Sequence, residues 1–205
     1  MRFYSLILSL VCILVFILQI LVPGLTEIFL LNKSSLIEPW RFVSAIFLHS
    51  SLQHLVFNLF ALIFFGLILE KIIGGKNFLF VFFVSGISAN LVSFNFYSAS
   101  LGSSGAIFGI IGSLTILRPK MVVWAFSLPM PLFVASILWM LGDVFGLFIP
   151  SNIGHIAHLS GFFLGIFFGL IFRVKYGQEK KESGKKIKIP EAYMKEWEDK
   201  YILRQ

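Results

Sequence analysis

The fold is decided by residues 102–109 of the 205-residue chain, which read Gly102-Ser103-Ser104-Gly105-Ala106-Ile107-Phe108-Gly109. Two hydroxyls stand between glycines where a short apolar helix is expected to begin. Serine is easily buried in a helix when its hydroxyl bonds back to a carbonyl, so the stretch alone is a weak signal. Its surroundings strengthen it, because hydrophobic segments flank this helix and histidines lie in or beside two of them. Ser104 is therefore a candidate nucleophile held within a membrane.

The composition is that of a membrane protein. Hydrophobic residues make up 58% of the chain and charged residues 13%, which is about half the charged share of a soluble domain. The mean hydropathy is +0.90. Phe alone occupies 25 positions, which favours lipid-facing and interhelical packing. The single cysteine, Cys12, cannot form an intrachain disulfide and indicates no redox compartment.

Six hydrophobic segments are predicted to be membrane spans, over about residues 4–22, 52–69, 77–96, 104–117, 121–141 and 154–172. A signal peptide is the alternative for the first, but the segment is long and lacks a cleavage site. The fourth has roughly fifteen residues against the ~20 that usually span a bilayer, so longer helices must surround it and water must reach its end. Pro129 and Pro131 are expected to bend the fifth, with Asp143 in the loop that follows. Residues 24–50 are expected to form a structured loop with short helices, in which Trp40 is an interface anchor.

The basic residues predict an orientation. One side of the six spans receives most of them: Arg2, Lys71, Lys76, Arg118, Lys120 and the ten Lys and Arg residues from Arg173 onward. Only Lys33 and Arg41 fall on the other side. The positive-inside rule then places both termini in the cytoplasm and the start of the fourth span toward the outer face of the cell membrane. We therefore expect a six-span membrane domain over residues 1–172 and a basic cytoplasmic tail over 173–205.

Residues 178–205 are compatible with a linker followed by a short amphipathic helix, with Tyr193, Trp197 and Tyr201 on one face that suits an interface or a partner groove. A solvated, partly disordered tail is the favoured interpretation. Basic residues near an anionic leaflet contribute about 1 kcal/mol each, which makes the lipid bilayer the expected partner. Nucleic-acid binding is the rival interpretation. It is disfavoured because the tail mixes charge signs and carries no nucleic-acid-binding signature.

All four histidines, His49, His54, His155 and His158, map to the outer half of this topology. Ionisable groups at membrane depth usually face a cavity or a partner, although loop or interface positions would explain these histidines equally well. His54 and Asn58 are four residues apart and share one helix face.

Two stripes of small residues point to a contact between the fourth and sixth spans. One stripe consists of Ala157, Gly161, Gly165 and Gly169, and the other of Gly105, Gly109 and Ser113. Such faces let two helix backbones approach closely in a membrane. If the stripes mate, Ser104 and His158 come together at similar depth. Ordinary helix packing without chemistry is the simpler alternative.

A serine beside a histidine is sufficient for acyl transfer without a third acid. His158 would take the Ser104 proton and return it to the leaving amine. Ser104 would lie among the unsatisfied amides of a helix N-terminus. With the Asn58 amide and His49 or His54, those amides would hold the oxyanion.

The ordered motifs resemble those of a family, the rhomboid intramembrane serine proteases of the minimal six-span prokaryotic kind. The matching positions are Trp40-Arg41, His49, His54, Asn58, Gly102-x-Ser104-Gly105 and Ala157-His158-x-x-Gly161-x-x-x-Gly165. The resemblance implies an all-α six-helix bundle with a short central fourth helix. It also implies a Ser104–His158 dyad, with oxyanion positions at His54, Asn58 and the Ser104 amide. His49 opens the same motif, and Phe108 would pack on His158.

By the same resemblance, the substrates are single-span membrane proteins and no metal or cofactor is implied, while the oligomeric state is left open. Two other classes of function remain. A metal carrier would use the four histidines as ligands, with no carboxylate nearby except Asp143. A non-catalytic relative would bind and remodel membrane clients, but such proteins typically lack the dyad that is present here.

Overall fold

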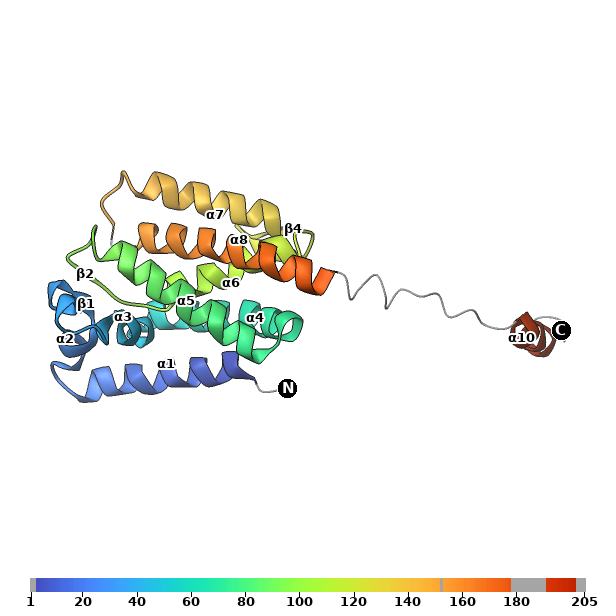
Figure 1. Cartoon of the computed structure of the whole chain (residues 1–205), viewed down its shortest axis with the longest axis horizontal. Helices are drawn as coiled ribbons and strands as arrows, with labels where there is room; N and C mark the ends of the chain where they lie inside the picture. Colours follow the sequence, from blue (N-terminus) through green and yellow to red (C-terminus); the bar gives the residue numbers. More distant parts are fainter. Residues whose placement is uncertain (1–2, 152, 178–190, 202–205) are drawn as a thin grey trace.

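The computed structural model describes residues 3–151, 153–177 and 191–201 (Figure 1). The longer helices are α1 (Tyr4–Leu21), α4 (Leu52–Ile73), α5 (Gly75–Ser93), α6 (Ser104–Leu117), α7 (Leu132–Gly146), α8 (His155–Gly177) and α10 (Glu191–Tyr201). Shorter elements are α2 (Leu25–Phe29), η1 (Lys33–Leu36), α3 (Arg41–Ser44) and η2 (Ala45–Phe47). The strands are β1 (Leu31–Asn32), β2 (Ala99–Ser100), β3 (Val122–Ala125) and β4 (Leu128–Pro131).

The chain forms an all-α membrane bundle with a short central helix, as the apolar segments and the family resemblance predict. Within the described residues, α1, α4, α5 and α8 are long and apolar enough to cross a membrane, and α6 and α7 are shorter apolar helices. The predicted bounds of the spans agree with the helices to within a few residues, except in the fifth. A count of six crossings stays a prediction.

The short helix α6 lies at the centre of the bundle, with α7 on one side of it and α1 on the other (Figure 1). It contacts α4, α5 and α8, and its contact with α8 is the most extensive between any two described elements. Most of its residues are buried, including Ala106, Ile110 and Leu114. A helix surrounded in this way is not exposed to lipid, which explains how a span of 14 residues is tolerated.

Glycines set the close contact between α6 and α8. A Cβ added at Gly161 would overlap the carbonyl oxygen of Gly105, and one added at Gly165 would overlap that of Gly109. Near the far end of α6, a Cβ on Gly169 would lie 2.9 Å from the Ser113 carbonyl oxygen. The two predicted stripes therefore mate residue by residue.

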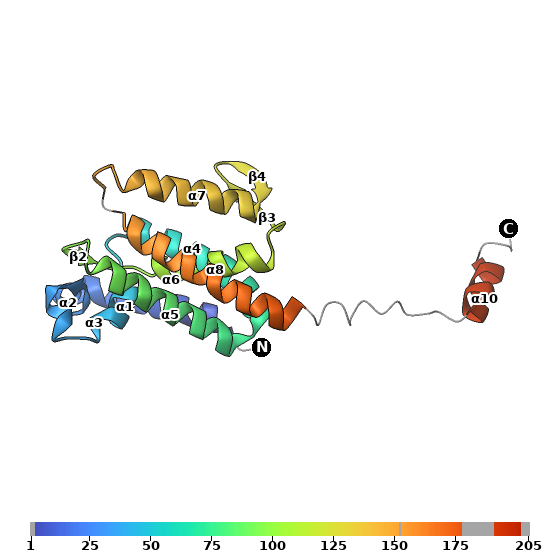
Figure 2. The ribbon, with the colours of Figure 1, turned by 45° about the horizontal axis from the view of Figure 1, so that its top comes forward.

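The fifth predicted span is wrong over its first half. Residues 122–131 form an antiparallel β-hairpin of β3 and β4 instead of a bent helix, and α7 begins only at Leu132 (Figure 2). The turn consists of Phe126 and Ser127, which both have positive φ. This conformation matches a two-residue hairpin turn. Asp143, expected in a loop, lies instead in the last turn of α7.

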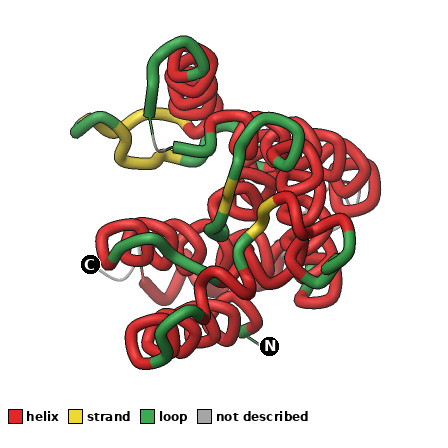
Figure 3. The backbone as a smooth tube through the Cα atoms, turned by 90° about the vertical axis from the view of Figure 1, so that its left-hand side faces the viewer, coloured by secondary structure: helices red, strands yellow, loops and turns green. Residues whose placement is uncertain are grey.

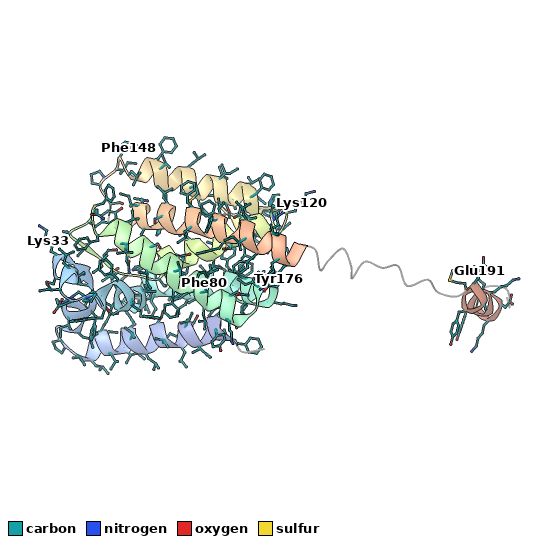
Figure 4. All side chains as sticks on the ribbon, viewed as in Figure 1. Lys33, Phe80, Lys120, Phe148, Tyr176 and Glu191 are labelled. Atoms are coloured by element: carbon teal, nitrogen blue, oxygen red, sulfur yellow. The ribbon has the colours of Figure 1, made fainter. Side chains whose placement is uncertain are left out.

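The start of α1 and the end of α8 lie at the same face, beside the turn between α4 and α5. The backbone amides of Tyr4 and Ser5 donate to the buried Glu70 carboxylate, at 2.9 and 3.0 Å. Near the end of α8, the Tyr176 hydroxyl donates to the Ile73 carbonyl at 3.1 Å. Figure 4 shows Tyr176 and Lys120 at this face, whereas Lys33 and Phe148 lie at the opposite face.

The opposite face carries the structured loop that the sequence predicts. The buried Arg41 donates through Nη1 to the carbonyls of Glu27 and Leu30, and through Nε to the Glu38 carboxylate. Strand β1 of this loop pairs with β2, directly upstream of α6 (Figure 3). The loop therefore supports the segment that leads into α6.

Residues 191–201 form the short helix α10, the less favoured of the two interpretations of this segment, and its Tyr193 and Tyr201 are exposed. The predicted linker over residues 178–190 and the side chain of Trp197 lie outside the described residues.

Candidate active site

Ser104 is the first residue of α6 and is presented by a fixed turn. The Gly102 amide donates to the Ala45 carbonyl at 2.8 Å, and Gly102 has φ +123°, which a residue with a Cβ rarely adopts. Ser103 is the N-cap and is buried, and its hydroxyl donates to Asn58 Oδ1 at 3.2 Å. Ser104 is partly exposed, and its hydroxyl has no hydrogen-bond partner among the described residues. Of the two serines, Ser104 alone is available to a reaction partner.

The imidazole of His158 lies over the first turns of α6. It stacks on the ring of Phe108 with the centroids 4.3 Å apart and the planes at 15°, which confirms the predicted packing. Phe108 is one helical turn from Ser104, and Ala157, next to His158, lies against Gly105. Ser104 and His158 therefore flank the same α6–α8 contact, although no hydrogen bond joins them in the described structure.

The buried carboxylate of Asp143 lies beside the Nδ1 edge of the His158 ring. Asp143 Oδ1 is 3.0 Å from His158 Nδ1 and 2.6 Å from His155 Nδ1. Asp143 is only 6% exposed and is held between the end of α7 and the start of α8. The sequence suggests Asp143 only as a ligand of a metal carrier and predicts no part for it in the chemistry of Ser104.

His54 faces the turn that presents Ser104. A Cβ added at Gly102 would lie 2.8 Å from His54 Cε1 and 2.9 Å from Nε2. The other ring nitrogen, Nδ1, is 3.1 Å from Ser50 Oγ, which leaves Nε2 directed at the Gly102 turn. The His54 and His158 imidazoles are close enough to interact electrostatically.

Asn58 is buried and linked to the same turn through Ser103. Its amide nitrogen donates to the carbonyl of His54 at 2.8 Å, one turn back along α4. One of its two N–H groups is thus used within the helix, and its oxygen accepts from Ser103. One N–H remains for a further acceptor.

His49 is 2% exposed and connects several elements. Its amide donates to Gln19 Oε1 of α1 at 3.0 Å, its Nδ1 is 3.2 Å from the Phe47 carbonyl, and its Nε2 is 3.5 Å from Ser103 Oγ. Burial, and to a lesser degree the neighbouring His54, lower the pKa of His49 to about 4. The ring therefore stays neutral at physiological pH.

A cavity of about 410 Å³ opens between the end of α5 and the loop from α7 to α8. Its lining includes Tyr97, Ser151 and His155, but neither Ser104 nor His158.

The family model of the Rhomboid domain matches residues 37–175 of this chain. The chain belongs to the rhomboid family. Together with the apolar helices, this makes it a multi-pass membrane protein.

Two curated rhomboid relatives match most of this chain. "RHOMBOID-like protein 1" of Arabidopsis thaliana is 28% identical over 171 residues, which are 81% of this chain and 43% of the relative. "Rhomboid protease GlpG" of Yersinia pseudotuberculosis serotype I (strain IP32953) is 29% identical over 160 residues, 76% of this chain and 57% of the relative. The chain thus spans about half the length of the curated relatives it matches.

The rhomboid fold does not gather the four histidines into one metal site. In the described part of the chain, one group has metal-ligand spacing, namely Asp143, His155 and His158, whose ligand atoms lie within 4.8 Å of one another. His49 and His54 form a separate pair whose rings meet edge to face at 5.1 Å.

Proposed function

We propose that this rhomboid is an intramembrane serine endopeptidase that cleaves transmembrane segments of single-span membrane proteins. The observation that carries the proposal is the glycine contact between α6 and α8. It supports a Ser104–His158 pair because Gly105 and Ala157, the neighbours of these two residues, lie against each other. The name of the Yersinia relative, a rhomboid protease, points to the same reaction class.

In the proposed reaction, Ser104 Oγ attacks the carbonyl carbon of the scissile peptide bond while His158 Nε2 takes the hydroxyl proton. The tetrahedral intermediate collapses, and the leaving amine receives that proton from His158. Water then attacks the acyl-enzyme, with His158 again as base, and releases the new carboxyl end. Serine and histidine are regenerated, and no metal or cofactor takes part.

The negative oxygen of the intermediate would be held by the Ser104 backbone amide at the N-terminus of α6, with His54 Nε2–H and the second Asn58 N–H as further donors. His49 would support this oxyanion site indirectly. Its ring packs on that of His54 and approaches Ser103. Loss of one such donor typically costs about 10²–10³ in rate.

The proposed orientation places the termini and the β3–β4 hairpin in the cytoplasm and the site toward the outer face. The positive-inside rule supports this, because Lys120 lies at the face of Tyr176 (Figure 4) and Arg118 is two residues from it in the sequence. Lys71 and Lys76 flank the turn between α4 and α5, where the Tyr176 hydroxyl bonds to the Ile73 carbonyl. A cysteine-accessibility scan of intact cells would test it.

The test of the function is cleavage of a generic single-span substrate by the purified protein in liposomes. Wild type should cleave within the substrate's transmembrane segment, and Ser104→Ala and His158→Ala should not, although both variants still unfold cooperatively on heating. Cleavage by either variant at the wild-type rate would overturn the proposal.

A further inference from the structure

A single carboxylate oxygen of Asp143, Oδ1, lies within hydrogen-bond distance of two imidazoles, 2.6 Å from His155 Nδ1 and 3.0 Å from His158 Nδ1, and His158 is the proposed base. An ionised carboxylate only accepts hydrogen bonds, so both Nδ1 atoms must carry hydrogen. A neutral His158 with hydrogen on Nδ1 has its lone pair on Nε2. That is the nitrogen the proposed reaction requires.

The second imidazole, His155, fits the same assignment. Its Nε2 is 2.9 Å from Ser151 Oγ, and that oxygen in turn accepts from the Ile153 amide at 3.3 Å. Ser151 therefore donates its hydroxyl hydrogen to His155 Nε2, and His155 donates its Nδ1–H to Asp143. Each hydrogen-bond donor in the series Ser151–His155–Asp143–His158 then has an acceptor, and neither imidazole needs a second proton.

Packing holds the chain of hydrogen bonds in place. A Cβ added at Gly146 would overlap the His155 ring, so this glycine lets the ring pack against the last turn of α7. Asp143 lies one turn before Gly146, and His155 and His158 lie one turn apart on α8. Phe108 fixes the plane of His158, and the carboxylate fixes which edge of the ring points away from α7.

We propose that Asp143, held by His155, is a positioning residue that sets the tautomer and orientation of His158. The proposal rests on the proposed protease function, since His158 is assigned there as the base. The expected Ser104–His158 dyad then becomes a set of four residues, in which the buried Asp143 carboxylate holds His158 and is itself held by His155. In serine proteases with a buried aspartate in this position, replacing it by asparagine lowers kcat by about 10⁴ because the wrong tautomer forms.

The kinetic test compares Asp143→Asn and Asp143→Glu with wild type, using the full chain in liposomes and a fluorogenic transmembrane peptide. Asp143→Asn should lower kcat by about 10²-fold or more, with KM within about twofold. Asp143→Glu, which keeps the carboxylate, should recover part of the lost kcat. The matched control is Ser136→Ala, which removes a buried hydroxyl of α7 that bonds to Thr115 instead. It should leave kcat unchanged.

The structural test needs no activity. Nitrogen-15 spectra of histidine-labelled protein, with His158 assigned by comparison with His158→Ala, should show the Nδ1–H tautomer in wild type. In Asp143→Asn the Nε2–H tautomer should appear. Wild-type protein with His158 in the Nε2–H form would overturn the proposal even if Asp143→Asn failed to fold.

The two proposals fail in different ways. If wild type cleaves, Ser104→Ala does not, and Asp143→Asn keeps wild-type kcat, then the positioning role is wrong and the protease function stands. If wild type does not cleave but its His158 tautomer changes in Asp143→Asn, then the protease function is wrong and the carboxylate still controls the ring.

Discussion

Gly161 of α8 lies directly against Gly105 of α6, so closely that a Cβ on Gly161 would overlap the Gly105 carbonyl oxygen. Backbone cannot move aside as a flexible side chain can. Gly161→Ala should therefore separate the two helices near Ser104 and destabilise the protein by about 1–3 kcal/mol. We expect a lower midpoint of thermal unfolding in detergent, together with loss of substrate cleavage.

Gly142→Ala is the matched control, because a Cβ at Gly142 of α7 meets nothing within 4 Å. It should keep both the unfolding midpoint and the cleavage rate. Equal behaviour of the two alanine variants would show that the α6–α8 contact does not set the site.

Glu70 should stabilise the N-terminus of α1 from a distance of 65 residues in sequence. Its carboxylate accepts from the Ser5 amide and hydroxyl, both at 3.0 Å, and from the Tyr4 amide. Glu70→Ala removes this acceptor for the first turn of α1, and we expect a loss of about 1–3 kcal/mol in unfolding free energy. Thermal or denaturant unfolding in detergent would measure it. Glu27→Gln is the control, because the Glu27 side chain is exposed. A loss of unfolding free energy of the same size in this variant would contradict the role of Glu70.

His49 should make the protein less stable in acid. Its pKa is about 4 in the folded state and near 6.5 in the unfolded chain, so the unfolded state binds more protons between these values. The contribution of His49 is complete above about pH 6.5 and declines as the pH falls toward 4. Unfolding midpoints measured from pH 7.5 to 4.5 should fall, and less steeply in His49→Gln. Parallel curves for the two proteins would refute the assignment.

Removal of metal ions should not affect cleavage. Asp143, His155 and His158 have spacing that fits an ion, but hydrogen bonds from both imidazoles already satisfy the Asp143 oxygen. We expect an excess of a strong chelator to leave the cleavage rate in liposomes within about twofold of untreated protein, because serine–histidine chemistry needs no Lewis acid. Loss of cleavage that zinc restores would instead favour the metal-binding alternative.

Local sequence patterns correctly predicted the long apolar helices and the contact between α6 and α8. The apolar runs located α1, α4, α5 and α8, since twenty apolar residues have few other stable arrangements. The spacing of Gly161 and Gly165 predicted the α6–α8 contact, because close approach of helices requires small residues at that period.

Hydropathy gave a wrong prediction for residues 122–131, because an apolar segment can form either a membrane-spanning helix or a β-hairpin. Residues 122–131 are as apolar as a span, yet Pro129 and Pro131 suit a short strand at the edge of a hairpin better than a helix interior. The same error led to the prediction that Asp143 lies in a loop, so its contact with His158 was not predicted. The Asp143–His158 contact depends on how α7 is rotated about its axis relative to α8. The spacing of residues within one segment does not predict that rotation.

The most direct measurement is mass spectrometry of the protein after reaction with a fluorophosphonate probe. Ser103 and Ser104 are adjacent, but only the Ser104 hydroxyl is free, while that of Ser103 is buried against Asn58. We predict one adduct, on Ser104, which persists in Ser103→Ala and is lost in His158→Ala. An adduct on Ser103, or undiminished labelling of Ser104 in His158→Ala, would contradict it.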